Sequence, residues 1–522
     1  MNNFNWKSLS LQDLEWVYKD FPFKKTRPYR HQLIGMAFAA NEKRIGFWMD
    51  VGVGKTLTAY WSAMQWGCHK ILVVCPGSAI SAWVRDAKKT NYSYEIISGE
   101  TSERKAKILQ RQCVSILQYE SLKTVFAKLG KTLGYTILKG NLTAEDASEL
   151  VKEDDRRKVI LDKENPGKYL VVKEKSRSWK IDETSFIHFD CIIFDEIHRC
   201  NNYSALQSEI CLELSKRAKF TVGLSGTPVD RCLLELFNIY RVLDLGKTFG
   251  WNFLGFRSSY FTKWGFDWQI KSKEQKDRLL EKWATSSLSF DRKECFDLPE
   301  CQEEVLLLQP TKEFQDLEMK VIGGIPLEVL GLSAIFVQAS TKVIKLKQLT
   351  DGFLYFNEDR NNRVAYRLKE NPKLEAVLEL FDCGKKMIVF HRFEEVGDIL
   401  CEALQKQGTR YIRLKGGLKP EERSELERQF QEDPEVLGAV VQEAAGAEGW
   451  DGFSAEVVVF WDIISSPKIR KQCIGRMLRS GQTKATLVIE LVLEKSINEV
   501  TKKNQGSRKT EVEEYMEYIQ GK

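Results

Sequence analysis

Short runs of apolar residues alternate with longer, mostly polar stretches in two separate parts of the chain. Apolar runs separated by polar segments of helical length are typical of a parallel sheet whose strands alternate with helices. The sequence therefore predicts an α/β fold with two parallel-sheet lobes. The expected strands are 45–49, 71–75, 114–117, 189–195 and 220–224 in the first lobe, and 387–390, 411–414, 438–441, 456–460 and 486–491 in the second.

The same pattern divides the chain into four expected regions. Residues 1–245 would form the N-terminal lobe, interrupted by a charged insertion at 123–185 to which we assign no chemistry. Residues 246–369 contain few strand-like runs, so we expect helical elaboration and a helical connector there. Residues 370–500 would form the C-terminal lobe. Residues 501–522 would form a tail that ends in a short solvated helix.

Composition excludes several classes of protein. No run approaches the roughly 18–20 apolar residues of a membrane span, and the N-terminus lacks a basic-then-apolar signal, so we expect a cytoplasmic protein. The twelve cysteines form no C-x-x-C pair and no His/Cys cluster at zinc spacing, which predicts reduced, mostly buried thiols. The net charge of +6 is compatible with a nucleic-acid partner but does not require one.

A glycine-rich segment, MDVGVGKT at 49–56, follows the first expected strand. A loop of this kind between a strand and a helix directs several backbone N–H groups toward one point, which favours phosphate binding. Lys55 would reach the β- and γ-phosphates of ATP, and the Thr56 hydroxyl would ligate Mg²⁺. The strict phosphate-loop spacing is not met, because Met49 occupies the position of the first glycine. The expected ATP-binding residues of this loop are Val51, Gly52, Val53, Gly54, Lys55 and Thr56.

An apolar run at 189–194 ends in two adjacent carboxylates, Asp195 and Glu196. Acidic residues at the carboxyl end of a buried parallel strand lie where such sheets bind ligands. Asp195 would hold Mg²⁺, and Glu196 would orient and deprotonate the attacking water. Together with the glycine-rich loop, this pair predicts hydrolysis of a nucleoside triphosphate.

Further motifs follow in a fixed order, and together they resemble the superfamily 2 helicase-type ATPases, within them the Swi/Snf-like DNA translocases. The resemblance extends from about residue 27 to residue 500, except for the insertion, and favours a compact bacterial or viral form. The cytoplasm would then be that of a bacterium or of a virus-infected host. The segments that carry the resemblance are 27–32, 73–83, 116–122, 224–228, 292–299, 371–374, 387–393, 445–451 and 472–482.

This resemblance implies two RecA-like lobes that hydrolyse ATP with Mg²⁺ in the cleft between them. Gln32 would read the adenine, and Gly449 and Asp451 would contact the nucleotide. Ser225 and Thr227 would bond the carboxylates of the acidic pair. Two basic residues three positions apart, Arg476 and Arg479, share a helical face and would serve as arginine fingers toward the γ-phosphate. The residues expected to contact nucleic acid are Pro76, Gly77, Ser78, Ser121, His391 and Gly446.

The second lobe departs from the family pattern at positions 442, 443 and 451, and at 465–467, where Ser-Ser-Pro replaces the usual Trp-Asn-Pro. Asp451 stands where relatives usually have Asn, and Gln442 and Glu443 stand where they have Ser or Thr. Relatives contact nucleotide or nucleic-acid backbone at these positions, and a carboxylate that faces phosphate would repel it. The ATP contacts of this lobe are therefore better specified by sequence than its nucleic-acid contacts.

Three functions remain open at this point. The first is a DNA-stimulated ATPase that translocates on duplex or branched DNA, as in remodelling or branch migration. The second is an RNA helicase, and the third is an ATP-dependent switch or assembly subunit without net translocation. The dependence of ATP turnover on DNA and on DNA length separates the first from the third. The sequence does not choose between strand separation and translocation, nor does it set a polarity.

Overall fold

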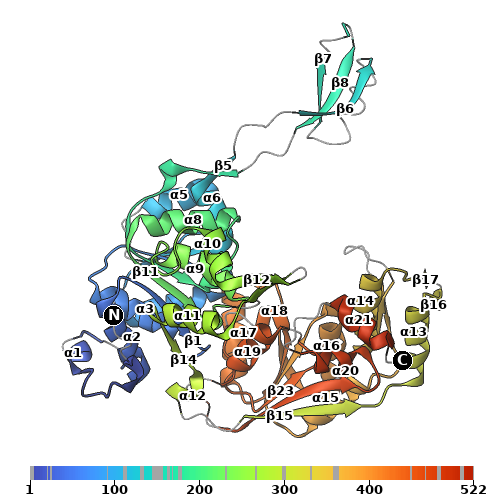
Figure 1. Cartoon of the computed structure of the whole chain (residues 1–522). Helices are drawn as coiled ribbons and strands as arrows, with labels where there is room; N and C mark the ends of the chain where they lie inside the picture. The colour runs from blue at the N-terminus through green and yellow to red at the C-terminus, as the bar shows by residue number, and fades with distance from the viewer. Residues whose placement is uncertain are drawn as a thin grey trace.

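The computed structural model describes residues 5–19, 21–23, 26–90, 92–109, 114–129, 135–143, 157–161, 165–166, 168–174, 179–229, 232–264, 267–296, 301–329, 332–356, 364–446, 450–464, 466–478, 482, 484–505 and 511–520. Two lobes, each built on a parallel sheet flanked by helices, lie next to each other (Figure 1). The predicted α/β fold with two parallel-sheet lobes is confirmed.

The seven-stranded sheet of the first lobe contains all five strands predicted there. Every neighbouring pair in it runs parallel. The strand order is β14 (Ser287–Phe290), β1 (Arg44–Met49), β11 (Ala218–Ser225), β10 (Phe189–Asp195), β2 (Ile71–Cys75), β4 (Val114–Gln118) and β3 (Tyr94–Ile96). Because β1, β11, β10, β2 and β4 end at one edge, the loops that follow them gather there.

Apolar clusters cover both faces of this sheet, as a central parallel sheet requires. Phe47 and Val73 belong to one cluster, whereas their chain neighbours Trp48 and Leu72 belong to the other. The first cluster includes residues of α2 (Arg30–Asn41), α3 (Lys55–Gln65) and α4 (Ile80–Thr90). The second includes residues of α5 (Thr101–Leu109), α6 (Leu122–Phe126), α8 (Leu206–Lys216) and α9 (Leu236–Leu243).

The six-stranded sheet of the second lobe contains the other five predicted strands, again all parallel. Its order is β15 (Cys301–Leu308), β24 (Thr486–Leu493), β23 (Val457–Phe460), β20 (Met387–His391), β22 (Val436–Gln442) and β21 (Arg410–Leu414). The helices of this part of the chain are α15 (Pro372–Asp382), α16 (Glu394–Gln407), α17 (Pro420–Glu432), α18 (Glu443–Gly446), α19 (Pro467–Gly475) and α20 (Ile497–Lys503).

The region expected to be a helical connector, 246–369, contributes a strand to each large sheet. β14 pairs with β1 in the first lobe, and β15 pairs with β24 in the second, so the chain crosses between the lobes here. β15 lies at a sheet edge and contains the polar run Gln302-Glu303-Glu304, so it lacks the continuous apolar run of a central strand. The region also contains α10 (Phe253–Tyr260), β12 (Phe261–Trp264), β13 (Asp267–Ile270), α11 (Lys273–Ala284), α12 (Arg292–Cys295), α13 (Lys312–Gly323), β16 (Leu327–Val329), β17 (Leu332–Ala334), α14 (Ala339–Thr350), β18 (Phe353–Tyr355) and β19 (Ala365–Arg367).

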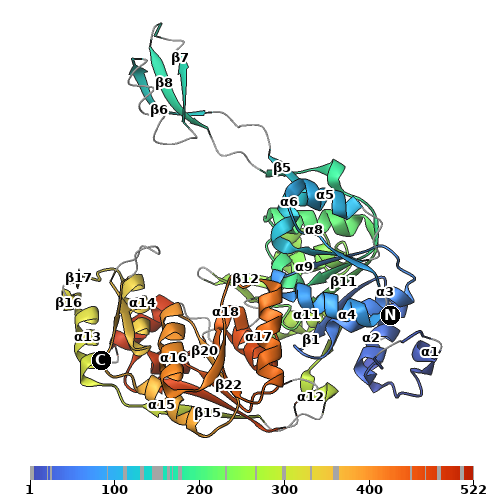
Figure 2. The same cartoon turned by 180° about the vertical axis from the view of Figure 1, so that it is seen from behind.

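The insertion predicted at 123–185 contains a small antiparallel sheet that stands away from the first lobe (Figure 2). Its strands follow the order β6 (Tyr135–Leu142), β8 (Tyr169–Glu174) and β7 (Arg157–Leu161). A pair of short strands, β5 (Ala127–Leu129) and β9 (Trp179–Ile181), lies at its base. The side chain of Phe126 is buried in the lobe, so the first residues of the expected insertion belong to the lobe core.

The expectation of a solvated C-terminal helix was wrong. α21 (Glu511–Gln520) packs against α14 and α20 through Tyr515 and Tyr518, which are 4% and 5% exposed. These rings are three positions apart and therefore lie on one helical face, where they join an apolar cluster with Leu346. The Tyr518 hydroxyl donates to the buried Glu318 carboxylate.

Within the described residues, no helix combines the length and apolar character that crossing a bilayer demands.

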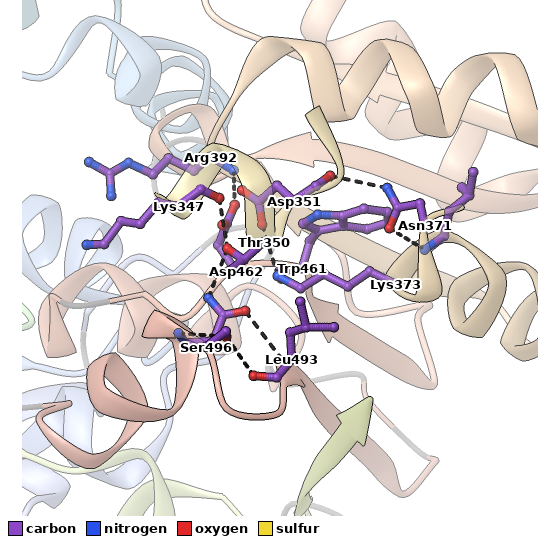
Figure 3. A network of polar contacts seen from close by, with 12 residues as sticks. Lys347, Thr350, Asp351, Asn371, Lys373, Arg392, Trp461, Asp462, Leu493 and Ser496 are labelled. Carbon is purple, nitrogen blue, oxygen red and sulfur yellow. Dashed lines mark hydrogen bonds and ion pairs between the residues drawn. The ribbon is translucent and has the colours of Figure 1, made fainter. Parts of the chain in front are cut away.

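A buried polar network joins four segments of the second lobe (Figure 3). The Lys373 ammonium, at the start of α15, donates to Asp351 Oδ1 at 2.9 Å and to the Trp461 carbonyl at 2.8 Å. Both charged side chains of this ion pair are at most 1% exposed. Beside them, Asp462 Oδ2 accepts from the backbone N–H of Arg392 at 2.9 Å. This network fixes the end of α14 to the carboxyl ends of β23 and β20.

Candidate active site

The glycine-rich loop lies between β1 and α3, as its sequence predicted. Gly52 and Gly54 both have φ of 85°, a left-handed conformation that favours glycine. A Cβ atom at Gly54 would also lie 2.3 Å from Nε2 of Gln32. The loop therefore needs glycine at this position for two reasons, backbone conformation and close packing.

The Lys55 side chain is held inside this loop. Its ammonium donates to the carbonyls of Met49 at 2.8 Å and Asp50 at 3.2 Å. Burial lowers the pKa of Lys55, and the nearby carboxylates of Glu196 and Asp195 oppose this shift. A phosphate bound in the loop would compete with the two carbonyls for this cation.

The acidic pair follows β10 and lies near Lys55. Asp195 Oδ2 accepts a hydrogen bond of 2.8 Å from the indole N–H of Trp83, a fully buried residue of α4. Burial raises the pKa of Asp195, and the negative charge of Glu196 adds to the effect. Trp83 lies within the 73–83 segment, but sequence reasoning did not assign it a role.

Glu196 adopts a left-handed conformation, with φ of 50°, at the turn after the strand. Its Oε2 accepts from the Ser225 hydroxyl at 3.1 Å, as predicted, and lies 3.1 Å from His198 Nδ1. The same imidazole nitrogen lies 3.1 Å from Ser225 Oγ. Thr227 does not form the expected bond to the acidic pair. Its backbone N–H donates to Ser225 Oγ, and within the described structure its hydroxyl has no partner.

Residues of both lobes line one cavity of about 540 Å³. From the first lobe come the glycine-rich loop, Asp195 and Glu196, and from the second come Asp451, Phe453 and Arg476. A volume of this size is suitable for a nucleotide-sized ligand. Gly449 and Arg479, also predicted for this site, lie outside the described residues.

Gln32 lines the cavity and is tied to its surroundings. Its Oε1 accepts from the Tyr29 N–H at 2.9 Å, and its Nε2 donates to the Gly54 carbonyl at 3.2 Å. Two aromatic rings that sequence reasoning missed lie in the same wall, since Tyr29 and Phe296 meet edge to face with centroids 4.9 Å apart. Tyr29 is 47% exposed, so its ring is available to a ligand base.

Two ion pairs connect the lobes at the rim of this cavity. Arg85 of α4 lies 3.3 Å from Asp451, and Lys471 of α19 lies 2.6 Å from Asp50. Asp451, a residue at which this chain departs from the family pattern, thus faces a cation of the opposite lobe. No local sequence pattern predicted these roles for Arg85 and Lys471, because each pairs with a residue more than 360 positions away in the chain.

Arg292 of α12 is packed between the glycine-rich loop and the second lobe. Its Nε donates to the Val51 carbonyl at 3.1 Å, and its backbone N–H donates to Asp50 Oδ2 at 3.1 Å. A Cβ at Gly475 would lie 2.7 Å from Arg292 Nη2 and 3.0 Å from Val51 Cβ. The absence of a side chain at 475 therefore lets α19 approach the loop and places Arg476 in the cavity.

The residues predicted to contact nucleic acid are not gathered on one surface. Pro76 and Ser78 line the cavity, and Gly77 and Ser78 are partly exposed. Ser121 is 1% exposed and accepts from Arg104 at 2.9 Å, and His391 is 2% exposed with Nδ1 2.8 Å from the Phe393 carbonyl. The side chains of Ser121 and His391 are thus packed inside the lobes in this structure, and their contact with nucleic acid stays a prediction.

Gly446 is also buried, in a position that no side chain could share. A Cβ there would lie 2.5 Å from the Phe390 ring and 2.6 Å from Val441. Its glycine is explained by packing against β20 and β22. The predicted contact of Gly446 with a nucleic-acid strand stays a prediction.

The predicted metal ligands fit Mg²⁺ bound together with a nucleotide. Thr56 and Asp195 both line the cavity and offer oxygen atoms, which Mg²⁺ prefers. In the part of the chain that the structure describes, no group of three or more His, Cys, Asp or Glu residues could hold a metal alone. This donor set suits an ion whose remaining ligands are phosphate oxygens and water.

Two family models match the chain in the same order as the lobes. Residues 23–230 match the model described as the res subunit of type III restriction enzymes. Residues 372–481 match the helicase conserved C-terminal domain. The first match includes the glycine-rich loop and the acidic pair, and the second includes Arg476.

The similar proteins include a Xenopus laevis protein described as SWI/SNF-related matrix-associated actin-dependent regulator of chromatin subfamily A-like protein 1. It is 27% identical over 60% of this chain and 31% of its own length. A Bacillus subtilis protein, described as the putative ATP-dependent helicase/translocase YwqA, is 24% identical over 61% of this chain and 34% of its length. The match thus spans about a third of each relative.

Among solved structures, the SWI2/SNF2 ATPase core of Sulfolobus solfataricus in complex with dsDNA is 18% identical. The alignment covers 93% of this chain and 92% of that one, with a TM-score of 0.40, which is too low to add to the argument. The ordered domain matches and the SWI/SNF-related sequences together support a Snf2-like ATPase of superfamily 2, the helicase-type ATPases.

Proposed function

We propose that this protein hydrolyses ATP between its lobes and uses the cycle to translocate on duplex or branched DNA. The observation that carries the proposal is the composition of the cavity. Lys55 and Glu196 come from the first lobe and Arg476 from the second, and all three line the same space. A site divided in this way is complete only when the lobes approach each other, so catalysis is tied to lobe movement.

The chemistry follows from the positions of these side chains. Glu196, held by Ser225 and close to His198, would orient the attacking water and accept its proton. Lys55 and Arg476 would neutralise the charge that develops on the transferring phosphoryl group. Thr56 and Asp195 would hold Mg²⁺, which when bound supplies further neutralisation of the β- and γ-phosphates.

The inter-lobe ion pairs suggest how hydrolysis is coupled to motion. Asp50 precedes the phosphate loop and pairs with Lys471, while Asp451 pairs with Arg85 at the same rim. A nucleotide that contacts both lobes would alter the distance between these partners. Binding and release of ATP would therefore change the lobe orientation, which is what a step along DNA requires.

DNA is the proposed partner because of the relatives and the charge. The Bacillus subtilis relative is described as a putative helicase/translocase, and the Xenopus relative as a regulator of chromatin. The net charge of +6 is compatible with a polyanionic partner. We expect a grip on phosphates that is sensitive to salt and indifferent to base sequence.

The test is the rate of ATP hydrolysis with single-stranded, duplex, forked and four-way DNA, with RNA as the control. We expect duplex or branched DNA to stimulate at least as well as single strands, and RNA to be poor. Movement is measured by displacement of the third strand of a triplex. Stimulation by DNA without any ATP-driven displacement or branch migration would replace the translocase by an ATP-dependent switch.

A further inference from the structure

A second hollow lies outside the ATP site, between α10 and the β12–β13 hairpin. Its volume is about 490 Å³. We call it the hairpin pocket, and the cationic, hydroxyl and indole side chains of its lining belong to Arg257, Ser258, Thr262, Lys263, Trp268 and Lys271. Thr262, Lys263 and Lys271 are exposed, so the pocket is open to solvent.

The charged side chains that line the hairpin pocket are cationic. They belong to Arg257, Lys263 and Lys271, and the lining given by the described residues includes no acidic side chain. Among the described residues, none of the three cations forms an ion pair, although the surface of this protein carries many pairs elsewhere. Like charges that converge on one hollow repel each other, so the arrangement favours an anionic ligand.

Neighbouring groups hold two of these cations in place. The Arg257 guanidinium lies over the Trp268 ring, 4.2 Å from its centroid, and 5.4 Å from that of Phe253. Lys271 donates to the Ser258 carbonyl, which leaves ammonium protons for another acceptor. A guanidinium ordered on an indole face loses less entropy on binding a phosphate than a mobile one.

The hairpin also has a suitable position. In both overall views it extends from the first lobe toward the side where the second lobe lies (Figures 1 and 2). The segment 246–290 carries eight basic and four acidic residues, so much of the net positive charge of the chain is located in it. A strand that touches both lobes can therefore reach this pocket.

We propose that the hairpin pocket binds the phosphodiester backbone of the nucleic-acid substrate. Arg257, Lys263 and Lys271 contact phosphate oxygens, and the hydroxyls of Ser258 and Thr262 are additional donors. The proposal rests on the proposed function, in which DNA is the substrate. It adds a contact that lies outside the helicase motifs and reads no base sequence.

The experiment compares two double variants of the full-length protein that remove the same charge. Lys263→Gln with Lys271→Gln changes the pocket, whereas Lys276→Gln with Lys282→Gln changes exposed lysines of α11 that do not line it. Binding to a fluorescent duplex is measured by anisotropy over a series of salt concentrations. Loss of two phosphate contacts lowers the slope of log K against log salt by about 1.8, and we expect affinity to fall about tenfold.

The outcomes separate this proposal from the proposed function. If the pocket variant has the same salt slope and the same affinity for duplex DNA as the α11 control, the hairpin site is overturned, although DNA binding by the protein stands. A parent protein that does not bind DNA refutes the proposed function itself. Titration with inorganic phosphate distinguishes the source of the anion, because saturable, pocket-dependent phosphate binding with an unchanged DNA slope overturns the nucleic-acid assignment. DNA-independent ATP turnover and thermal unfolding are expected to match the parent in both variants.

Discussion

The indole N–H of Trp83 donates to Asp195 Oδ2 at 2.8 Å, although the two residues are 112 positions apart. Trp83 packs edge-on against Tyr60 of α3, with ring centroids 5.1 Å apart, and the Tyr60 hydroxyl donates to the Trp83 carbonyl. Because α3 begins at Lys55, this contact connects the phosphate-loop helix to the acidic pair. It also fixes one oxygen of the predicted metal ligand.

Replacement of Trp83 by Phe removes this donor and keeps most of the packing. We expect the Mg²⁺ concentration for half-maximal turnover to rise about tenfold, because the Asp195 carboxylate loses its orienting bond. In the presence of Mg²⁺, the Trp83→Phe variant should bind a fluorescent ATP analogue more weakly than the parent does. In EDTA, the two proteins should bind the analogue equally well. Trp61→Phe, which alters another buried indole of the same lobe, is the control. If the variant lost as much affinity for the analogue in EDTA as in Mg²⁺, Trp83 would have only a packing role.

Replacement of Glu196 by Gln keeps the shape of the side chain but removes the proton acceptor. Turnover should fall by about 10²–10⁴-fold, while ATP binding persists, because binding depends mainly on the phosphate loop. Lys55→Ala, in contrast, should weaken binding as well. Single-turnover hydrolysis and filter binding measure the two effects. Near-parental hydrolysis by the Glu196 variant would contradict its assignment as the base.

Replacement of Arg476 by Ala tests the division of the site between lobes. Turnover should fall about 10³-fold with little change in ATP binding, because the guanidinium acts on charge that develops in the transition state. Arg410→Ala, at an exposed ion pair of the same lobe, is the matched control. Arg479→Ala is expected to behave similarly. If both arginines were dispensable for DNA-stimulated turnover, the two-lobe site would be refuted.

The raised pKa of Glu443 predicts that the free energy of unfolding falls as pH rises. Burial, together with the charge of Asp462, raises the pKa of Glu443 to about 7, against the opposing cations Arg392 and Lys347. The folded state thus holds one proton more than the unfolded state between about pH 4.5 and 7, and its stability falls as pH rises through that range. Glu443→Gln should be more stable than the parent by about 1–3 kcal/mol at pH 8 and equal to it near pH 4.5.

Urea unfolding of the full chain at both pH values measures this effect. Glu435→Gln removes an exposed carboxylate of the same lobe and should not alter the pH dependence. A variant of Glu443 whose stability relative to the parent is the same at both pH values would contradict a raised pKa.

The buried ion pair of Lys373 and Asp351 predicts a large effect on folding. Lys373→Met should destabilise the second lobe by about 3–5 kcal/mol, because it leaves the Asp351 carboxylate buried without its cation. A further Asp351→Asn change should recover part of the loss. Lys385→Met, at an exposed position, is the control. Thermal unfolding measures the difference, and a parental melting temperature for the single variant would contradict the prediction.

Sequence alone determined the features that depend on local pattern. The ten predicted strands are present because most of them are apolar runs buried on both faces of a parallel sheet, whereas the edge strand β21 is only partly buried. The phosphate loop and the pair Asp195–Glu196 were identified by residue type and spacing along a few positions. Their proximity follows from topology, because the carboxyl ends of parallel strands share one edge.

Tertiary structure alone decided the features that depend on residues far apart in the chain. The bond from Trp83 to Asp195 and the pair of Lys471 with Asp50 join segments that no local pattern relates. The burial of the Ser121 and His391 side chains was likewise decided by tertiary structure, because motif spacing does not report how deeply a side chain is packed. A local pattern specifies the element, whereas packing between distant elements specifies which side chains meet.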